Sequence, residues 1–223
     1  MSPAISLLVL AAMLANQAGG TRTIDFERDS LGSHPNAFTF AHTRQVGQPG
    51  EWVVKSDAQW ADRGKFLAQV GADPTALRFP VAVVDGFSAK DVELRVLFYP
   101  VSGRVDQAAG LIWRYQDENN YYVVRANARE SNVVLYKVEN GKRTDLPLKG
   151  VGRTYGERAQ VPVKQWSELR VVVRGSLFQV FYAGRKLFEV EDTTFRGAGR
   201  VGLWTKSDSI TYFDNLVITT LDR

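Results

Sequence analysis

Hydrophobic and polar residues alternate over many short stretches of this chain, which is the pattern of β-strands with one buried face. The clearest region spans residues 110–142 and its immediate N-terminal flank, with segments at 108–116, 121–129 and 133–138 separated by the polar turns 117–120 and 130–132. The last segment ends at Glu139-Asn140-Gly141, and Asn-Gly is a strong hairpin signal. We therefore predict three consecutive antiparallel strands here.

The middle segment of this region divides into two rows of side chains, because successive strand residues point to opposite faces. One row is apolar: Tyr122, Val124, Ala126 and Ala128. The other is largely polar: Tyr121, Val123, Arg125, Asn127 and Arg129. A middle strand with so polar a side is either exposed to solvent on that side or lines a binding face. We predict that this row points into an accessible concavity.

The rest of the chain predicts further short strands separated by turn-forming residues. They are expected at 23–27, 38–43, 51–56, 65–70, 77–84, 91–99, 166–174, 177–182, 186–190, 200–206 and 209–219. Residues 144–163 are rich in Gly and Pro and predict irregular loop or short strands. Beyond the N-terminal segment no long stretch has helical periodicity. The fold class predicted is all-β, an antiparallel two-sheet sandwich occupying residues 20–223 as one domain.

Residues 1–19 differ from the rest of the chain. They contain no charged residue, and positions 5–15 form an almost continuous apolar run that is too short for a membrane span. Small residues at Ala15, Ala18 and Gly19 offer cleavage positions, although no Lys or Arg precedes the run. We predict a signal peptide and an exported protein, periplasmic or extracellular, with no membrane span after its removal. A buried strand or helix is the alternative for this run.

Composition excludes several classes of function. The absence of cysteine rules out disulfides, thiolate metal sites and a cysteine nucleophile. The net charge of +4, from 28 Lys+Arg and 24 Asp+Glu, is dispersed along the chain without a run of like charge, so we expect no nucleic-acid partner. We expect the protein to be a monomer.

Three stretches carry a family resemblance: WSELRVVVRGSLFQVFYAGRKLFEV at 166–190, AGLIWRYQDENNYYVVRANA at 109–128 and GRVGLWTKSDSITYFDNLVI at 199–218. They resemble strands of concanavalin A-like jelly rolls of the laminin-G/glucanase type. More narrowly, the chain resembles exported proteins grouped with the 3-keto-disaccharide hydrolase-type, family 16 glycoside-hydrolase-like domains. The resemblance implies a jelly roll but not one activity, because this superfamily includes lectins, hydrolases, lyases and adhesion modules.

The catalytic motif of family 16 glucanases, Glu-x-Asp-x-x-Glu on one strand, is not reproduced. Its nearest match, beginning at Glu189, lacks the third acid, and the pair Asp91 and Glu93 has Val96 where a third acid would stand. The histidines, His34 and His42, suggest neither a metal pair nor a catalytic triad. We predict no catalytic residue, although the chemistry of keto-disaccharide hydrolases has no compact motif against which to test the chain.

A carbohydrate-binding site is better supported by residue types. Sugars are held by amides, guanidinium groups and carboxylates on their hydroxyls and by aromatic rings on their C–H faces. The predicted ligand-binding residues are Arg114, Tyr121, Arg125, Asn127, Arg129, Trp204 and Lys206. In the alternative, the arginines are solvated or ion-paired, and Trp113, Trp166 and Trp204 belong to the core.

The resemblance also suggests a calcium ion where the first and last strands meet. Asp25 and Glu27 near the start and Asp214 near the end are the candidate ligands, with ordinary strand-end acids as the alternative. The function predicted is an exported, non-catalytic carbohydrate-binding β-sandwich. Alternatives are a glycoside hydrolase of the 3-keto-disaccharide hydrolase type and a structural or adhesion module like laminin G.

Overall fold

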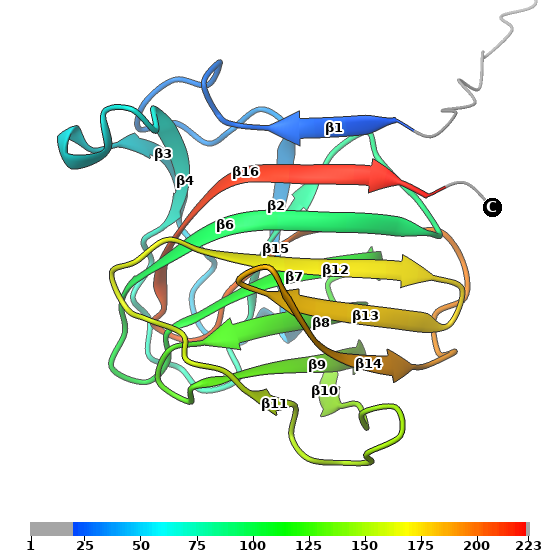
Figure 1. Cartoon of the computed structure of the whole chain (residues 1–223). Coiled ribbons are helices and arrows are strands. Elements are labelled where there is room, and N and C mark those ends of the chain that lie inside the picture. Colours follow the sequence, from blue (N-terminus) through cyan, green and yellow to red (C-terminus); the bar gives the residue numbers. More distant parts are fainter. Residues whose placement is uncertain (1–19, 222–223) are drawn as a thin grey trace, which may run out of the picture.

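The computed structural model describes residues 20–221, which form two eight-stranded antiparallel sheets packed face to face (Figure 1). In sheet A the strand order is β14-β13-β12-β6-β16-β4-β3, and β1 pairs with β16. Its strands are β14 (Arg185–Glu191), β13 (Leu177–Tyr182), β12 (Ser167–Arg174), β6 (Val92–Ser102), β16 (Ile210–Thr220), β4 (Lys65–Gln69), β3 (Trp52–Ser56) and β1 (Thr21–Ile24).

In sheet B the order is β10-β9-β8-β7-β15-β5-β2, and β11 pairs with β9. Its strands are β10 (Lys142–Asp145), β9 (Asn132–Glu139), β8 (Asn120–Asn127), β7 (Ala108–Asp117), β15 (Arg200–Trp204), β5 (Pro80–Val84), β2 (Phe38–His42) and β11 (Glu157–Arg158). The predicted all-β, two-sheet antiparallel class is confirmed. The predicted signal segment, 1–19, lies outside the described residues.

Helical structure between residues 20 and 221 is limited to two short 3-10 turns, η1 (Thr43–Gln45) and η2 (Ala58–Trp60). In this part of the chain no helix has the length and apolar character needed to cross a bilayer.

The hairpin predicted at Asn140-Gly141 is present between β9 and β10. Glu139 pairs with Lys142, and the two turn residues have φ values of 51° and 74°. Two consecutive positive φ values define a turn whose twist matches that of the flanking strands, and Asn followed by Gly is the pair that best tolerates it. Local sequence therefore sets the register of β9 against β10.

The main core lies between the sheets and contains the apolar row predicted on β8. Tyr122, Val124 and Ala126 face sheet A and are fully buried, and Ala128 packs at the edge of the same cluster. Trp113 of β7 stacks on Tyr122 with a centroid distance of 5.6 Å. Burial of each such large side chain contributes roughly 1.5–3 kcal/mol, so this row holds sheet B against sheet A.

Sheet B has a second apolar cluster on the face turned away from sheet A. Strand alternation places Tyr121 and Val123 of β8 and Trp204 of β15 there, and all three are fully buried. The sheet curls strongly around this cluster. Arg143 of β10 lies 4.7 Å from the ring centroid of Phe79, just before β5, although β10 and β5 are five places apart in the sheet.

The turn η1 completes the cover over this cluster. The hydroxyls of Thr43 and Tyr121 lie 2.7 Å apart, and the backbone N–H of Arg44 donates to Asn119 Oδ1 at 3.0 Å. The chain leaving β2 therefore reaches the turn between β7 and β8. As a result, the hollow face of sheet B is filled by its own side chains.

Candidate functional site

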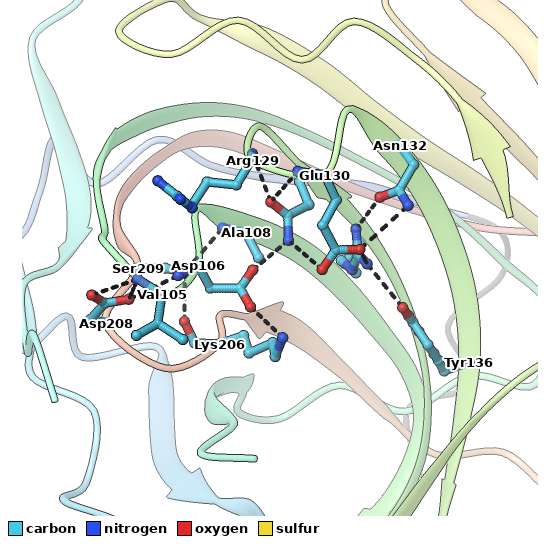
Figure 2. A network of polar contacts seen from close by, with 12 residues as sticks. Val105, Asp106, Ala108, Arg129, Glu130, Asn132, Tyr136, Lys206, Asp208 and Ser209 are labelled. Carbon is cyan, nitrogen blue, oxygen red and sulfur yellow. Dashed lines mark hydrogen bonds and ion pairs between the residues drawn. The ribbon is translucent and has the colours of Figure 1, made fainter. Parts of the chain in front are cut away.

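A network of polar side chains lies at one end of this outer face of sheet B (Figure 2). At its centre is Arg125 of β8, which has no exposed surface. Its guanidinium donates to Glu130 Oε2 at 2.6 Å, Asn132 Oδ1 at 2.5 Å and Tyr136 Oη at 3.0 Å. Burial favours the neutral form of Glu130, but the ion pair with Arg125 outweighs it and holds the pKa of Glu130 below its usual value. Glu130 is therefore ionised at neutral pH.

A second branch of the network runs through Asn127, also fully buried. Its amide donates to Asp106 Oδ1 and to Glu130 Oε1, the latter at 3.3 Å. Asp106 also pairs with Lys206, just beyond β15 (Figure 2). Asp208 fixes the loop before β7 because its carboxylate accepts from the backbone N–H groups of 104, 105 and 106. Three separate segments of chain thus converge on β8.

The carboxylates of Asp106 and Glu130, which both accept from the Asn127 amide, resemble the catalytic pair of a glycosidase only in their spacing. Since both accept from one nitrogen, their nearest oxygens lie at most roughly 6 Å apart. A glycosidase acid, however, needs a raised pKa so that it carries a proton at neutral pH. Glu130 has a lowered pKa and pairs with Arg125, while Asp106 pairs with Lys206. Glu130 is therefore not suited to be the general acid.

Four side chains form the exposed rim above the network: Arg129, Glu130, Tyr155 and Lys206. Tyr155, from the loop between β10 and β11, is 44% exposed, and its hydroxyl lies 3.0 Å from that of Tyr136. Arg129 is exposed, and the side chains of Glu130 and Lys206 keep 32% and 16% of their surface accessible. The rim is the part of this site that a ligand can touch.

The structure corrects the prediction that the polar row of β8 lines an accessible concavity. Tyr121, Arg125, Asn127 and Trp204 are all fully buried, and of the predicted residues on this face only Arg129 and Lys206 reach the surface. The row does face the hollow side of sheet B as predicted. The curl of the sheet and the η1 turn cover it, and neither feature is visible in the alternation of one strand.

Arg114 lies elsewhere, so its prediction as a neighbour of Arg125 across the strand pair is wrong. Its backbone has φ of 48°, and the register between β7 and β8 shifts after Trp113. This bulge turns the side chain toward sheet A, where it donates to the carbonyl oxygens of Lys90, Gly175 and Phe195 at 2.5–3.1 Å. Arg114 therefore hydrogen-bonds to three separate loops.

Among the candidate calcium ligands, and within the described residues, only the carboxylate of Asp214 forms an ion pair with a cationic side chain. Asp214 is almost fully buried and accepts from Arg63 at 3.2 Å. Lys65 donates its ammonium to the carbonyl oxygen of Glu27 at 2.9 Å and its backbone N–H to the Glu27 carboxylate at 2.6 Å, while Asp25 accepts from the Glu27 N–H. Within residues 20–221 no three His, Cys, Asp or Glu side chains gather as a metal site. Calcium stays a prediction.

The acid pairs set aside in the sequence do not converge in the structure. Glu189 pairs with Lys186 and Glu191 with Lys149, both at the surface. Glu93 pairs with Arg170 at 3.1 Å. These acids form local surface ion pairs, as expected for the solvated side of a strand.

Sequence reasoning missed Asp106, Glu130, Tyr136 and Tyr155. Glu130 stands in a stretch that predicts only a turn, and Tyr155 lies in the loop region without periodicity. The one local signal was Asn127 just before that turn, since an Asn side chain commonly accepts from backbone N–H groups two residues on. Asn127 does so, accepting from Arg129 at 2.9 Å.

Comparison with known proteins finds structures of similar fold. No protein-family model and no curated protein matches the sequence. The carbohydrate binding module CBM66 from Bacillus subtilis superposes with a TM-score of 0.61 at 18% identity, covering 83% of this chain and 98% of that one. Domain 4 of AbnA, a GH43 extracellular arabinanase from Geobacillus stearothermophilus, was solved in complex with arabinotriose. It superposes with a TM-score of 0.56 at 16% identity, covering 89% of this chain and 90% of that one. The cellulose induced protein Cip1 superposes with a TM-score of 0.62 at 12% identity, covering 90% of this chain and 97% of that one.

At these identities the likeness is one of fold. The chain has a concanavalin A-like jelly-roll sandwich, so the resemblance seen in the three sequence stretches is confirmed at that level. The narrower resemblance to keto-disaccharide hydrolase-type proteins stays a prediction.

Proposed function

We propose that this protein is an exported, non-catalytic carbohydrate-binding β-sandwich that holds a glycan at the exposed rim. The observation that carries the proposal is Tyr155, an exposed aromatic ring fixed in place by its hydroxyl contact with Tyr136. The guanidinium of Arg125 contacts Glu130 at 2.6 Å and Tyr155 at 3.4 Å, so carboxylate and ring are anchored to one buried group.

The rim offers what a sugar needs. An aromatic ring packs on the C–H face of a pyranose or furanose, and charged side chains hydrogen-bond its hydroxyls. Tyr155 supplies the ring, Glu130 an acceptor, and Arg129 and Lys206 the donors. The network beneath holds Tyr155, Glu130 and Lys206, so little entropy of these side chains is lost when a ligand binds.

The fold supports the same proposal by analogy only. Two of the similar structures are described as a carbohydrate binding module and as a domain in complex with arabinotriose. One fold carries many functions, so the rim and not the sandwich has to be tested.

A direct test is binding of the chain 20–223 to insoluble polysaccharides and to oligosaccharides, measured by pull-down and calorimetry. Tyr155→Ala and Arg129→Ala should each weaken binding roughly tenfold or more. The matched controls are Val151→Ala in the same loop and Arg185→Ala on β14, both exposed, and they should bind as the parent does. If the rim variants bind like the controls, the rim is not the site.

A specific observation favours the adhesion alternative. The predicted polar row is covered, which leaves a smaller polar surface than an open groove would offer. If no glycan binds or shifts the melting temperature, a structural module with a protein partner becomes the better reading. The hydrolase alternative is tested in the same panel, since product release above that of a heat-inactivated control would establish turnover.

Export rests on the apolar run at 5–15 and is tested separately. Expression of the full chain followed by N-terminal sequencing should show cleavage near Gly19. Recovery of the intact N-terminus from the cytoplasm would refute export. Elution at the mass of one chain in size-exclusion chromatography would support the predicted monomer.

A further inference from the structure

We propose that the protein has a second carbohydrate-binding site, in a surface pocket beside Trp166 at the start of β12. The pocket has a volume of about 490 Å³ and is lined by Gln160, Gln165, Trp166, Glu168 and Tyr182, among others. None of these residues belongs to the exposed rim or to the predicted site. The inference shares the ligand class of the proposed function but rests on a different surface.

Trp166 is a rigid element of this pocket because other rings hold it. Trp60 of η2 meets it edge-on at a centroid distance of 5.7 Å, and Tyr99 of β6 lies at 5.3 Å. The guanidinium of Arg63 lies over the ring at 4.4 Å. Unlike Trp52, Trp113 and Trp204, Trp166 is only partly buried. A partly exposed indole fixed in this way presents apolar area to a sugar without further loss of side-chain freedom.

The polar groups around Trp166 are those that bind sugar hydroxyls. Gln160 and Gln165 are exposed, and their side chains make no hydrogen bond with other residues between 20 and 221. Glu168 is 27% exposed and lies 3.5 Å from Arg95. The Tyr182 hydroxyl lies 3.2 Å from that of Ser167. Two free amides and a carboxylate lie in one pocket with an indole, and these groups repeat the chemistry of a carbohydrate subsite.

One anchored segment joins this pocket to the exposed rim. From Tyr155 the chain passes through β11 to Ala159, whose N–H donates to the carbonyl oxygen of Ser131 at 3.1 Å. It then reaches Lys164, whose N–H donates to the carbonyl oxygen of Pro100 at 2.8 Å. Figure 1 shows it running from beneath sheet B up to the start of β12. The eleven steps from Tyr155 to Trp166 span at most roughly 40 Å when fully extended. The pocket and the rim are therefore at most this far apart, on the outer faces of sheets A and B respectively.

Calorimetry and tryptophan fluorescence with arabinotriose, xylohexaose, cellohexaose and laminarihexaose test the inference. We expect two sugars bound per chain in the parent. At sugar concentrations just sufficient to fill both parental sites, Gln165→Ala and Tyr155→Ala should each leave only one of the two sites largely filled. Trp166→Phe, which keeps an aromatic ring in the cluster, should remove the fluorescence change at the second site. Gln165→Ala should weaken that site roughly tenfold, whereas Arg185→Ala should change nothing.

The outcomes separate the two proposals. One sugar per chain, lost in Tyr155→Ala but unaffected by Gln165→Ala and Trp166→Phe, overturns the second site and leaves the proposed function standing. One sugar per chain, lost in Gln165→Ala and unaffected by Tyr155→Ala, supports the Trp166 pocket and rejects the rim. Absence of binding for all four oligosaccharides rejects both. Because Gln165 is exposed, its variant remains informative even if Trp166→Phe is unstable.

Discussion

Replacing Glu130 with Gln tests the polar network most directly, because it removes one charge and keeps the shape of the side chain. Arg125 would then remain fully buried without its carboxylate partner at 2.6 Å. Removing one member of a buried ion pair costs about 3–5 kcal/mol, whereas exposed pairs contribute roughly 0.2–1 kcal/mol. Since the Glu130 side chain is 32% exposed, we expect an intermediate loss of about 2 kcal/mol in the free energy of unfolding.

The assay is urea unfolding at pH 7 together with thermal melting. For a chain of this size, a loss of about 2 kcal/mol lowers the melting temperature by roughly 4–8 °C. Glu139→Gln is the matched control. Its carboxylate pairs with Lys137 at 3.1 Å but is 46% exposed, so the same change should cost less than about 1 kcal/mol.

The pH dependence of stability provides a second, independent test of this prediction. The pKa of Glu130 lies below 4.5 in the folded state, so the unfolded state binds more protons as the pH falls. The stability that Glu130 contributes is therefore present above about pH 4.5 and lost below it. The difference between Glu130→Gln and the parent should be constant from pH 6 to 8 and shrink on acidification. A loss equal to that of Glu139→Gln, or a difference that grows at low pH, would refute the reasoning.

Three further predictions concern the second apolar cluster, the β9–β10 turn and calcium. Trp204→Ala should cost about 3–5 kcal/mol in urea unfolding, because the ring is fully buried; a cost below about 1 kcal/mol would contradict a second core. Gly141→Ala should destabilise more than Gly184→Ala, since both have positive φ but only at Gly141 would a Cβ meet the Arg44 side chain; equal losses in melting temperature would show that Arg44 moves away freely. The predicted calcium site requires a higher melting temperature in calcium than in EDTA, a difference that Asp214→Asn should abolish, and an unchanged midpoint rejects the site.

The alternation of residues along β8 was enough to predict the strand, its turns and which row faces the core. Tyr122, Val124 and Ala126 do lie between the sheets, and Asn140-Gly141 does form the hairpin turn. These features are local: a strand with one buried face requires a period of two, and a two-residue turn requires residues that tolerate positive φ. The contacts of Arg125 could not be predicted from its neighbours in the chain, because its partners include Tyr136 and Tyr155 on other elements.

What the sequence by itself determined was thus the two-sheet antiparallel sandwich and the division of each strand into two faces. Only the tertiary structure decided which of those faces is accessible. The polar row of β8 is covered by η1 at Tyr121, by Arg143 of β10 over Tyr136, and by the loop that carries Tyr155 at Arg125. The tertiary structure also decided the direction of Arg114, since the bulge that turns it toward sheet A arises from pairing between β7 and β8. Periodicity reports a residue's face, whereas exposure depends on segments distant in sequence that fold over that face.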